Sequence, residues 1–86
     1  MVKVYGFSAC PYCKELKEIL TKDGIQFIDV DIEQPENQEE FNKIMEIAKA
    51  DEVPIVIVGN QILVPNVSFQ SIKEASLLVI KLLNEM

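Results

Sequence analysis

The sequence contains no histidine and only two cysteines, Cys10 and Cys13. A structural zinc site needs four ligands, so the chain has too few nitrogen and sulfur donors to build one alone. Two cysteines this close in sequence enclose a very small loop, and a disulfide between them removes little entropy from the unfolded chain. The pair therefore indicates chemistry at sulfur rather than a structural cross-link.

Arginine is also absent, and eight lysines stand against fourteen aspartates and glutamates, which gives a net charge of −6. The acidic side chains are concentrated between Asp29 and Glu52. Such a surface repels phosphate groups, so we expect neither nucleic acid nor an anionic membrane as a partner.

Long apolar runs, linkers and repeats are missing as well. No stretch is long enough to span a membrane, and residues 1–9 lack the apolar core and cleavage site of a secretory signal. Apolar residues make up 49% of the 86 positions, which is enough for one hydrophobic core. We therefore expect one domain over residues 1–86, in a soluble cytoplasmic protein.

The start of the chain predicts a strand, a helix and a second strand. Val2–Tyr5 is typical of a short strand. Pro11 suits the first position of a helix, and Gly24 suits the left-handed residue that ends it. From Gln26 to Ile32, apolar and polar side chains alternate with the period of a strand.

The next segment predicts a helix and a hairpin. Apolar side chains recur at helical spacing from about Glu36 to Ala50. Ile55–Val58 is apolar without alternation, as in a central strand covered on both faces. Gly59-Asn60 is a hairpin signal that leads into a strand over Gln61–Val64.

The last predicted element is a helix that begins at a capping box, Ser71 to Glu74. Leu77 and Ile80 widen its apolar face, which indicates either contact with a neighbouring element or a weak dimer interface. We expect a monomer. The complete order of elements is βαβαββα, with a parallel pair of strands first and a hairpin second.

The two cysteines are predicted to lie at the start of the first helix, close enough to form a disulfide. Cys10 precedes the helix, where unpaired backbone N–H groups stabilise a thiolate, so we predict that it is the nucleophile. Cys13, about one turn inside, is predicted to resolve the mixed disulfide. Lys17 lies on the same helical face, where its charge is expected to support the thiolate.

Pro54 opens the predicted central strand and is the other candidate for the site. If the Val53–Pro54 bond is cis, Val53 presents its backbone N–H and C=O beside Cys10, ready to pair with an extended peptide or glutathione. A trans proline at the start of a strand is the alternative.

Cys10-Pro11-Tyr12-Cys13 on a first helix, followed by Val53-Pro54 before a hairpin, resembles the glutaredoxin family over the whole chain. The resemblance implies an α/β thioredoxin fold in its minimal form, with a four-stranded mixed sheet flanked by three helices. It also implies a thiol-disulfide oxidoreductase that reduces protein disulfides or glutathione mixed disulfides. In this family Tyr12 would line the substrate groove, and Val53 would pair with the cysteinyl backbone of glutathione.

Two residues and one five-residue segment depart from the family pattern. Phe7 stands where many relatives carry a lysine, and Glu52 stands where they carry a threonine. Val64–Ser68 replaces a Gly-Gly turn and an acidic or polar pair, so that Ser68 and the N–H groups of Val67 and Ser68 are left to hold glutathione. Glutathione and thioredoxin reductase are therefore both open as the electron donor.

Two other classes of function also stay open. A metal-binding module would be either a dimer that shares an iron–sulfur cluster through Cys10 and glutathione, or a copper carrier that uses both thiols. An interaction domain would leave the cysteines idle. We expect an enzyme that has a disulfide-containing protein as its substrate and no tightly bound cofactor or metal.

Overall fold

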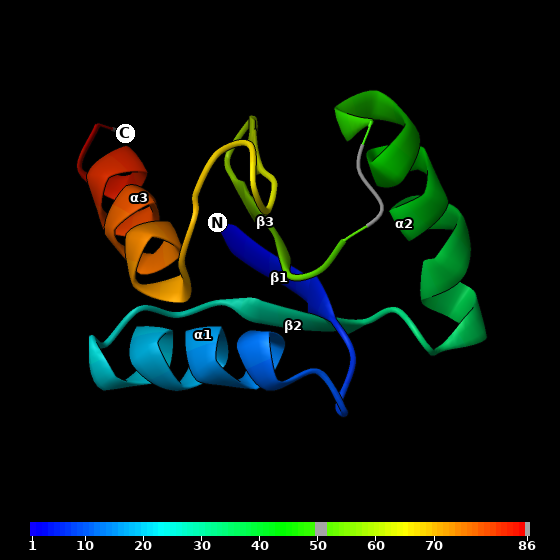
Figure 1. The fold of residues 1–86 in the computed structure, drawn as a ribbon, viewed down its shortest axis with the longest axis horizontal. Coiled ribbons are helices and arrows are strands. Elements are labelled where there is room, and N and C mark those ends of the chain that lie inside the picture. Colours follow the sequence, from blue (N-terminus) through cyan, green and yellow to red (C-terminus); the bar gives the residue numbers. More distant parts are fainter. Residues whose placement is uncertain (50–51, 86) are drawn as a thin grey trace.

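The structure is a computed structural model that describes residues 1–49 and 52–85. Strand β1 (Val2–Gly6) pairs in parallel with β2 (Ile28–Asp31) and antiparallel with β3 (Ile55–Val58). Strand β4 (Gln61–Leu63) pairs antiparallel with β3, so the mixed sheet has the order β2-β1-β3-β4 (Figure 1). This sheet confirms the predicted fold class.

Three helices flank the sheet, and their order confirms the predicted βαβαββα pattern: α1 (Pro11–Lys22), α2 (Pro35–Ala48) and α3 (Ile72–Glu85). Helix α2 ends at Ala48, followed by Lys49 with a left-handed φ of 54°. The predicted end of this helix at Ala50 lies outside the described residues. Within the part of the chain that is described, no helix is long and apolar enough to cross a membrane.

Helix α1 ends as the sequence predicts. Gly24 has a φ of 75°, and its N–H donates to the carbonyl of Thr21 at 3.1 Å. The N–H of Ile25 donates to the carbonyl of Leu20 at 2.9 Å. These two bonds form a Schellman motif, which satisfies carbonyls at the helix end and turns the chain toward β2.

Helix α3 begins with half of the predicted capping box. The Ser71 hydroxyl accepts from the N–H of Glu74 at 3.2 Å, as a cap should. The Glu74 carboxylate, however, accepts from the N–H of Gln70 at 3.3 Å, one residue before the cap. Further along the helix, Leu77 is 57% exposed and therefore contributes little to its packed face.

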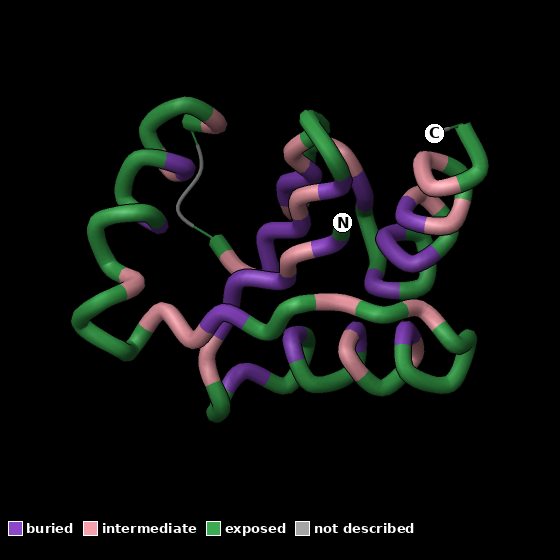
Figure 2. Tube along the Cα trace, turned by 180° about the vertical axis from the view of Figure 1, so that it is seen from behind, coloured by how far each residue is buried: buried purple, intermediate pink, exposed green. Residues whose placement is uncertain are grey.

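The buried side chains form two clusters on opposite faces of the sheet. In Figure 2 the backbone positions of buried residues, in purple, run along the strands and recur along the helices. Helices α1 and α3 cover one face together, and α2 covers the other. On the α2 face, Tyr5 is fully buried, and its hydroxyl donates to the Glu40 carboxylate at 3.0 Å. The larger cluster lies under α1 and α3: Val2, Val4, Leu16, Leu20, Val56, Val58, Leu63, Phe69, Ile72, Ala75 and Val79.

Candidate active site

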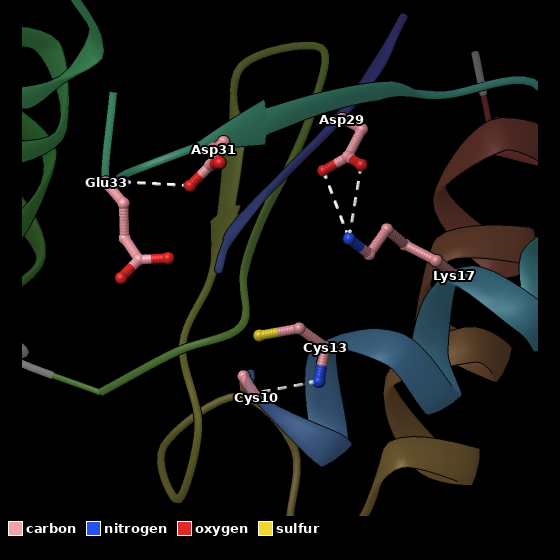
Figure 3. Close-up of polar contacts among 6 residues, drawn as sticks. All are labelled: Cys10, Cys13, Lys17, Asp29, Asp31 and Glu33. Atoms are coloured by element: carbon pink, nitrogen blue, oxygen red, sulfur yellow. Dashed lines mark hydrogen bonds and ion pairs between the residues drawn. The ribbon is translucent and has the colours of Figure 1, made fainter. Parts of the chain in front are cut away.

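Cys10 is the N-cap residue of α1, with the extended backbone (φ −84°, ψ 112°) that precedes a helix. Its sulfur accepts a hydrogen bond from the N–H of Cys13 at 3.3 Å (Figure 3). Pro11 follows at the first helical position, where the missing N–H removes no hydrogen bond. The Sγ of Cys10 therefore lies at the N-terminal end of the helix, beside backbone N–H groups that have no partner within the helix.

Cys13 lies one turn inside the helix and has no exposed surface. Burial raises the pKa of its thiol to about 12, and the hydrogen bond to Cys10 acts in the same direction. The backbone of Phe7 and the charge of Lys17 lower this pKa, but by less than burial raises it. Both cysteines are free thiols in this structure, and Cys13 is therefore protonated at neutral pH.

We expect iodoacetamide to alkylate Cys10 first in the folded, reduced protein and to leave Cys13 unmodified at about pH 8. Only a thiolate reacts, and Cys13 combines complete burial with a pKa near 12. Alkylation followed by peptide mass mapping measures the order, and the same reaction in urea is the control, in which both cysteines react. Equal rates at the two thiols of the folded protein would contradict this assignment.

Gly6, at the end of β1, lies directly against Cys13. A Cβ atom added at Gly6 would overlap the Cys13 sulfur and approach the Cys13 Cβ to 2.9 Å, closer than real Cβ atoms come to other carbons. The φ of Gly6 is not positive, so the backbone itself does not require glycine here. The requirement is steric, because the missing side chain makes room for the second thiol.

The Val53–Pro54 peptide bond is cis. Pro54 is buried and Val53 is half-buried, and both line the same groove as Cys10. Within residues 1–49 and 52–85, neither the N–H nor the C=O of Val53 has a backbone hydrogen-bond partner. Backbone groups in this position beside a groove suit pairing with an extended chain that enters it.

The groove beside Cys10 has a volume of about 760 Å³. Phe7, Tyr12 and Phe69 form part of its apolar lining, and Tyr12 is 61% exposed. A hollow of similar volume, about 790 Å³, lies at the other end of α1 beside Gly24, away from the thiols. The groove at Cys10 is therefore the one that brings a reactive group together with a place for a ligand.

Ser68, a predicted binding residue, forms a hydrogen bond within its own turn. Its hydroxyl accepts from the N–H of Val64 at 3.0 Å, and it is not part of the groove lining. The N–H groups of Val67 and Ser68 both donate to the carbonyl of Val64, at 3.3 and 2.9 Å. These groups close a tight turn and are not free to hold a ligand.

Lys17 has a partner that the sequence did not indicate. Its ammonium contacts both carboxylate oxygens of Asp29 on β2, each at 3.2 Å (Figure 3). This ion pair joins α1 to the edge of the sheet. The same charge lowers the pKa of Cys13, the buried thiol, so any support that Lys17 gives is directed there.

Sequence reasoning missed a contact across the groove. The amide of Asn66 donates to the Glu52 carboxylate at 2.7 Å, and the φ of Asn66 is 64°. Asparagine adopts this left-handed conformation more readily than most residues, which is the only signal the sequence offered. The bond links the loop before Pro54 to the loop after β4, and both loops line the groove.

The described side chains were also compared with the requirements of a metal site. Among the described residues, no group of three or more histidine, cysteine, aspartate or glutamate side chains is arranged to hold an ion.

Comparisons with known proteins agree with this geometry. The family model for glutaredoxin matches residues 2–63. An uncharacterised glutaredoxin-like 8.6 kDa protein in the rubredoxin operon of Clostridium pasteurianum is 31% identical over 64 residues, which are 74% of this chain and 83% of that protein. The crystal structure of a glutaredoxin from Archaeoglobus fulgidus is 28% identical, with a TM-score of 0.64, over 78% of this chain and 76% of that one. Wheat glutaredoxin has a TM-score of 0.76 at 21% identity, over 98% of this chain and 79% of its own, and supports the fold.

Proposed function

Because the chain belongs to the glutaredoxin family, we propose that it is a thiol-disulfide oxidoreductase that works through a Cys10–Cys13 dithiol/disulfide couple. Its substrates are protein disulfides or glutathione mixed disulfides. The observation that carries the proposal is the position of the Cys10 sulfur. It caps a helix, accepts the N–H of Cys13 and borders a groove large enough for a peptide segment.

The reaction begins when the Cys10 thiolate attacks one sulfur of a substrate disulfide. The bond between the two substrate sulfurs breaks, a mixed disulfide forms at Cys10, and the first substrate thiolate leaves and takes up a proton. Cys13 then gives up its proton and its thiolate attacks the Cys10 sulfur, so that the bond between Cys10 and the substrate breaks and the second substrate thiolate leaves and takes up a proton. Two cysteine thiols have become one disulfide, and one substrate disulfide has become two thiols.

The pKa of Cys13 falls during the reaction, as the second step requires. Burial is the largest cause of its raised pKa, but two further causes come from Cys10, through its hydrogen bond and its negative charge. Once Cys10 forms a mixed disulfide, both contributions from Cys10 disappear. The pKa of Cys13 then falls at the stage when its thiolate has to attack.

The groove supplies the binding groups. The N–H and C=O of Val53 pair with an extended substrate backbone and align its sulfur with Cys10. The ring of Tyr12, mostly exposed, offers a flat apolar contact at the groove. The charge of Lys17 favours the thiolate of Cys13 during resolution.

The electron donor is either glutathione or thioredoxin reductase. Family membership favours glutathione, as the resemblance implies. A specific observation favours the reductase: Glu52 places a carboxylate at the groove, where an anionic ligand such as glutathione is repelled.

We expect the oxidised protein, with its Cys10–Cys13 disulfide, to be reduced by at least one of these donors. The experiment times the reduction by glutathione and, separately, by NADPH with thioredoxin reductase, trapping thiols by alkylation and weighing the products. Faster reduction by glutathione identifies a glutathione-dependent enzyme, and preference for the reductase identifies a thioredoxin-like carrier. A disulfide that resists both donors would contradict the proposed function.

We propose further that the protein acts in the cytoplasm as a monomer, with residues 1–86 as one domain. No tightly bound cofactor is needed for the exchange reaction, because both electrons come from the two thiols. A metal or iron–sulfur module is disfavoured, because two thiols supply only half of a tetrahedral site.

A further inference from the structure

The groove beside Cys10 carries an unequal set of charges. Glu15 on α1 and Glu52 before Pro54 line it, with Lys73 on α3 as the one cation among its described lining residues. Glu15, Glu52 and Lys73 are exposed, and none of them forms a salt bridge with another described residue. Among the described residues, neither carboxylate is therefore paired with a cation.

The Glu52 carboxylate is held by one hydrogen bond across the groove. One of its oxygens accepts from the Asn66 amide at 2.7 Å, a contact that joins two loops on the groove. A carboxylate has about four lone-pair positions, so this single bond leaves acceptors open to a ligand. Because Asn66 is neutral, the charge of Glu52 is undiminished.

The surface around the groove suits a polypeptide. Tyr12 is 61% exposed, and Val67, next to the groove residue Asn66, is 77% exposed. Exposed apolar side chains of this size beside a reactive group indicate contact with another macromolecule. With the backbone groups of Val53, these positions offer an extended peptide both hydrogen bonds and apolar contact.

We propose that this groove selects disulfides whose cysteine lies in a positively charged peptide segment, and that Glu15 and Glu52 determine this specificity. The inference rests on the proposed function, because it names the class of protein substrate on which the same Cys10 attack takes place. The chain is acidic overall, with a net charge of −6, so its wider field draws the same class of partner toward the site.

The test uses two peptides that differ only beside one cysteine, which is held in a mixed disulfide with thionitrobenzoate. Lysine flanks the cysteine on both sides in one peptide, and glutamate flanks it in the other. The release of coloured thiolate gives the second-order rate constant of the reduced protein, at low and at high salt. Each rate constant is divided by the rate constant for reduction of the same peptide by dithiothreitol, a neutral thiol. This ratio removes the effect of the flanking charges on the reactivity of the disulfide itself.

At low salt we expect the lysine peptide to react about five-fold faster than the glutamate peptide after this correction, since an exposed charge pair changes a rate about two- to five-fold. High salt reduces the preference. The E15Q and E52Q variants, which keep the side-chain volume, each lower it. E18Q is the matched control, because Glu18 is on α1 but outside this groove. In the E18Q variant the preference for the lysine peptide is unchanged.

The outcomes separate the two proposals. Failure to reduce either peptide would overturn the proposed function itself. Reduction of both peptides at equal corrected rates at low salt would overturn charge selection and leave the oxidoreductase assignment standing. A preference that survives in both E15Q and E52Q would show that these two carboxylates do not determine it.

Discussion

Cys10→Ser protein is expected to reduce disulfides on the order of a thousand-fold more slowly than the unchanged chain, or not measurably. A serine hydroxyl is not ionised at neutral pH, so the helix N-terminus no longer holds a nucleophile. The sulfur of Cys10 borders the groove, whereas Cys13 is completely buried and protonated and does not replace it. Turnover of a protein disulfide, followed by thiol release, measures the loss.

Cys13→Ser protein is the matched partner of this variant. It keeps the Cys10 nucleophile and is expected to stop after the first step, as a stable mixed disulfide with the substrate. Intact-mass spectrometry detects this species as an adduct of one substrate chain on one protein chain. Repeated turnover by Cys13→Ser without glutathione or another added thiol would show that Cys13 is not the resolving group.

Gly6→Ala is expected to destabilise the protein by about 1–3 kcal/mol, the usual cost of forcing extra volume into a packed site. The new methyl group would overlap the Cys13 sulfur, so helix α1 or the Cys13 side chain has to move. A displacement of about 1 Å at reacting groups slows a reaction by as much as about 100-fold. Urea unfolding and the rate of disulfide reduction measure the two effects together.

Gly24→Ala is the control for Gly6→Ala, because it makes the same chemical change at the far end of α1. Gly24 has a φ of 75°, and a Cβ there would have no neighbour within 4 Å. The expected cost is about 1 kcal/mol of backbone strain, with no change in the reduction rate.

Adding Cys13→Ala to Gly6→Ala should recover part of the lost stability, since the sulfur is then gone. Purely additive effects would contradict a direct clash.

The sequence predicted the order of the elements because its periodic patterns are strong. Ile55–Val58 is uniformly apolar and proves to be a central strand, and Gly24 ends α1 with the expected positive φ. The ends of the helices were predicted less accurately than the order of the elements, because capping depends on local hydrogen bonds. At the start of α3, for instance, Glu74 bonds to the N–H of Gln70 instead of Ser71.

Only those site residues that belong to a short sequence motif could be predicted. The cysteine pair and Val53-Pro54 are short and recognisable. The Ser68 hydroxyl accepts a bond within its own turn, and a pattern of residue types does not show that competition. The need for glycine at position 6 and the partner of Glu52 arise from contacts between segments far apart in the chain, which no local pattern encodes.

The hydrophobic core is divided unequally between the two faces of the sheet. This division determines which helix unfolds locally at the lower cost in free energy. Among the described residues, eleven buried side chains form the cluster under α1 and α3, and five form the cluster under α2. Local opening costs less where fewer apolar groups become exposed to water, so the amides of α2 should exchange their hydrogens with solvent before those of α1. Cys13 and Gly6 meet on the α1 side. The chain thus places its most easily opened helix on the face away from the buried thiol.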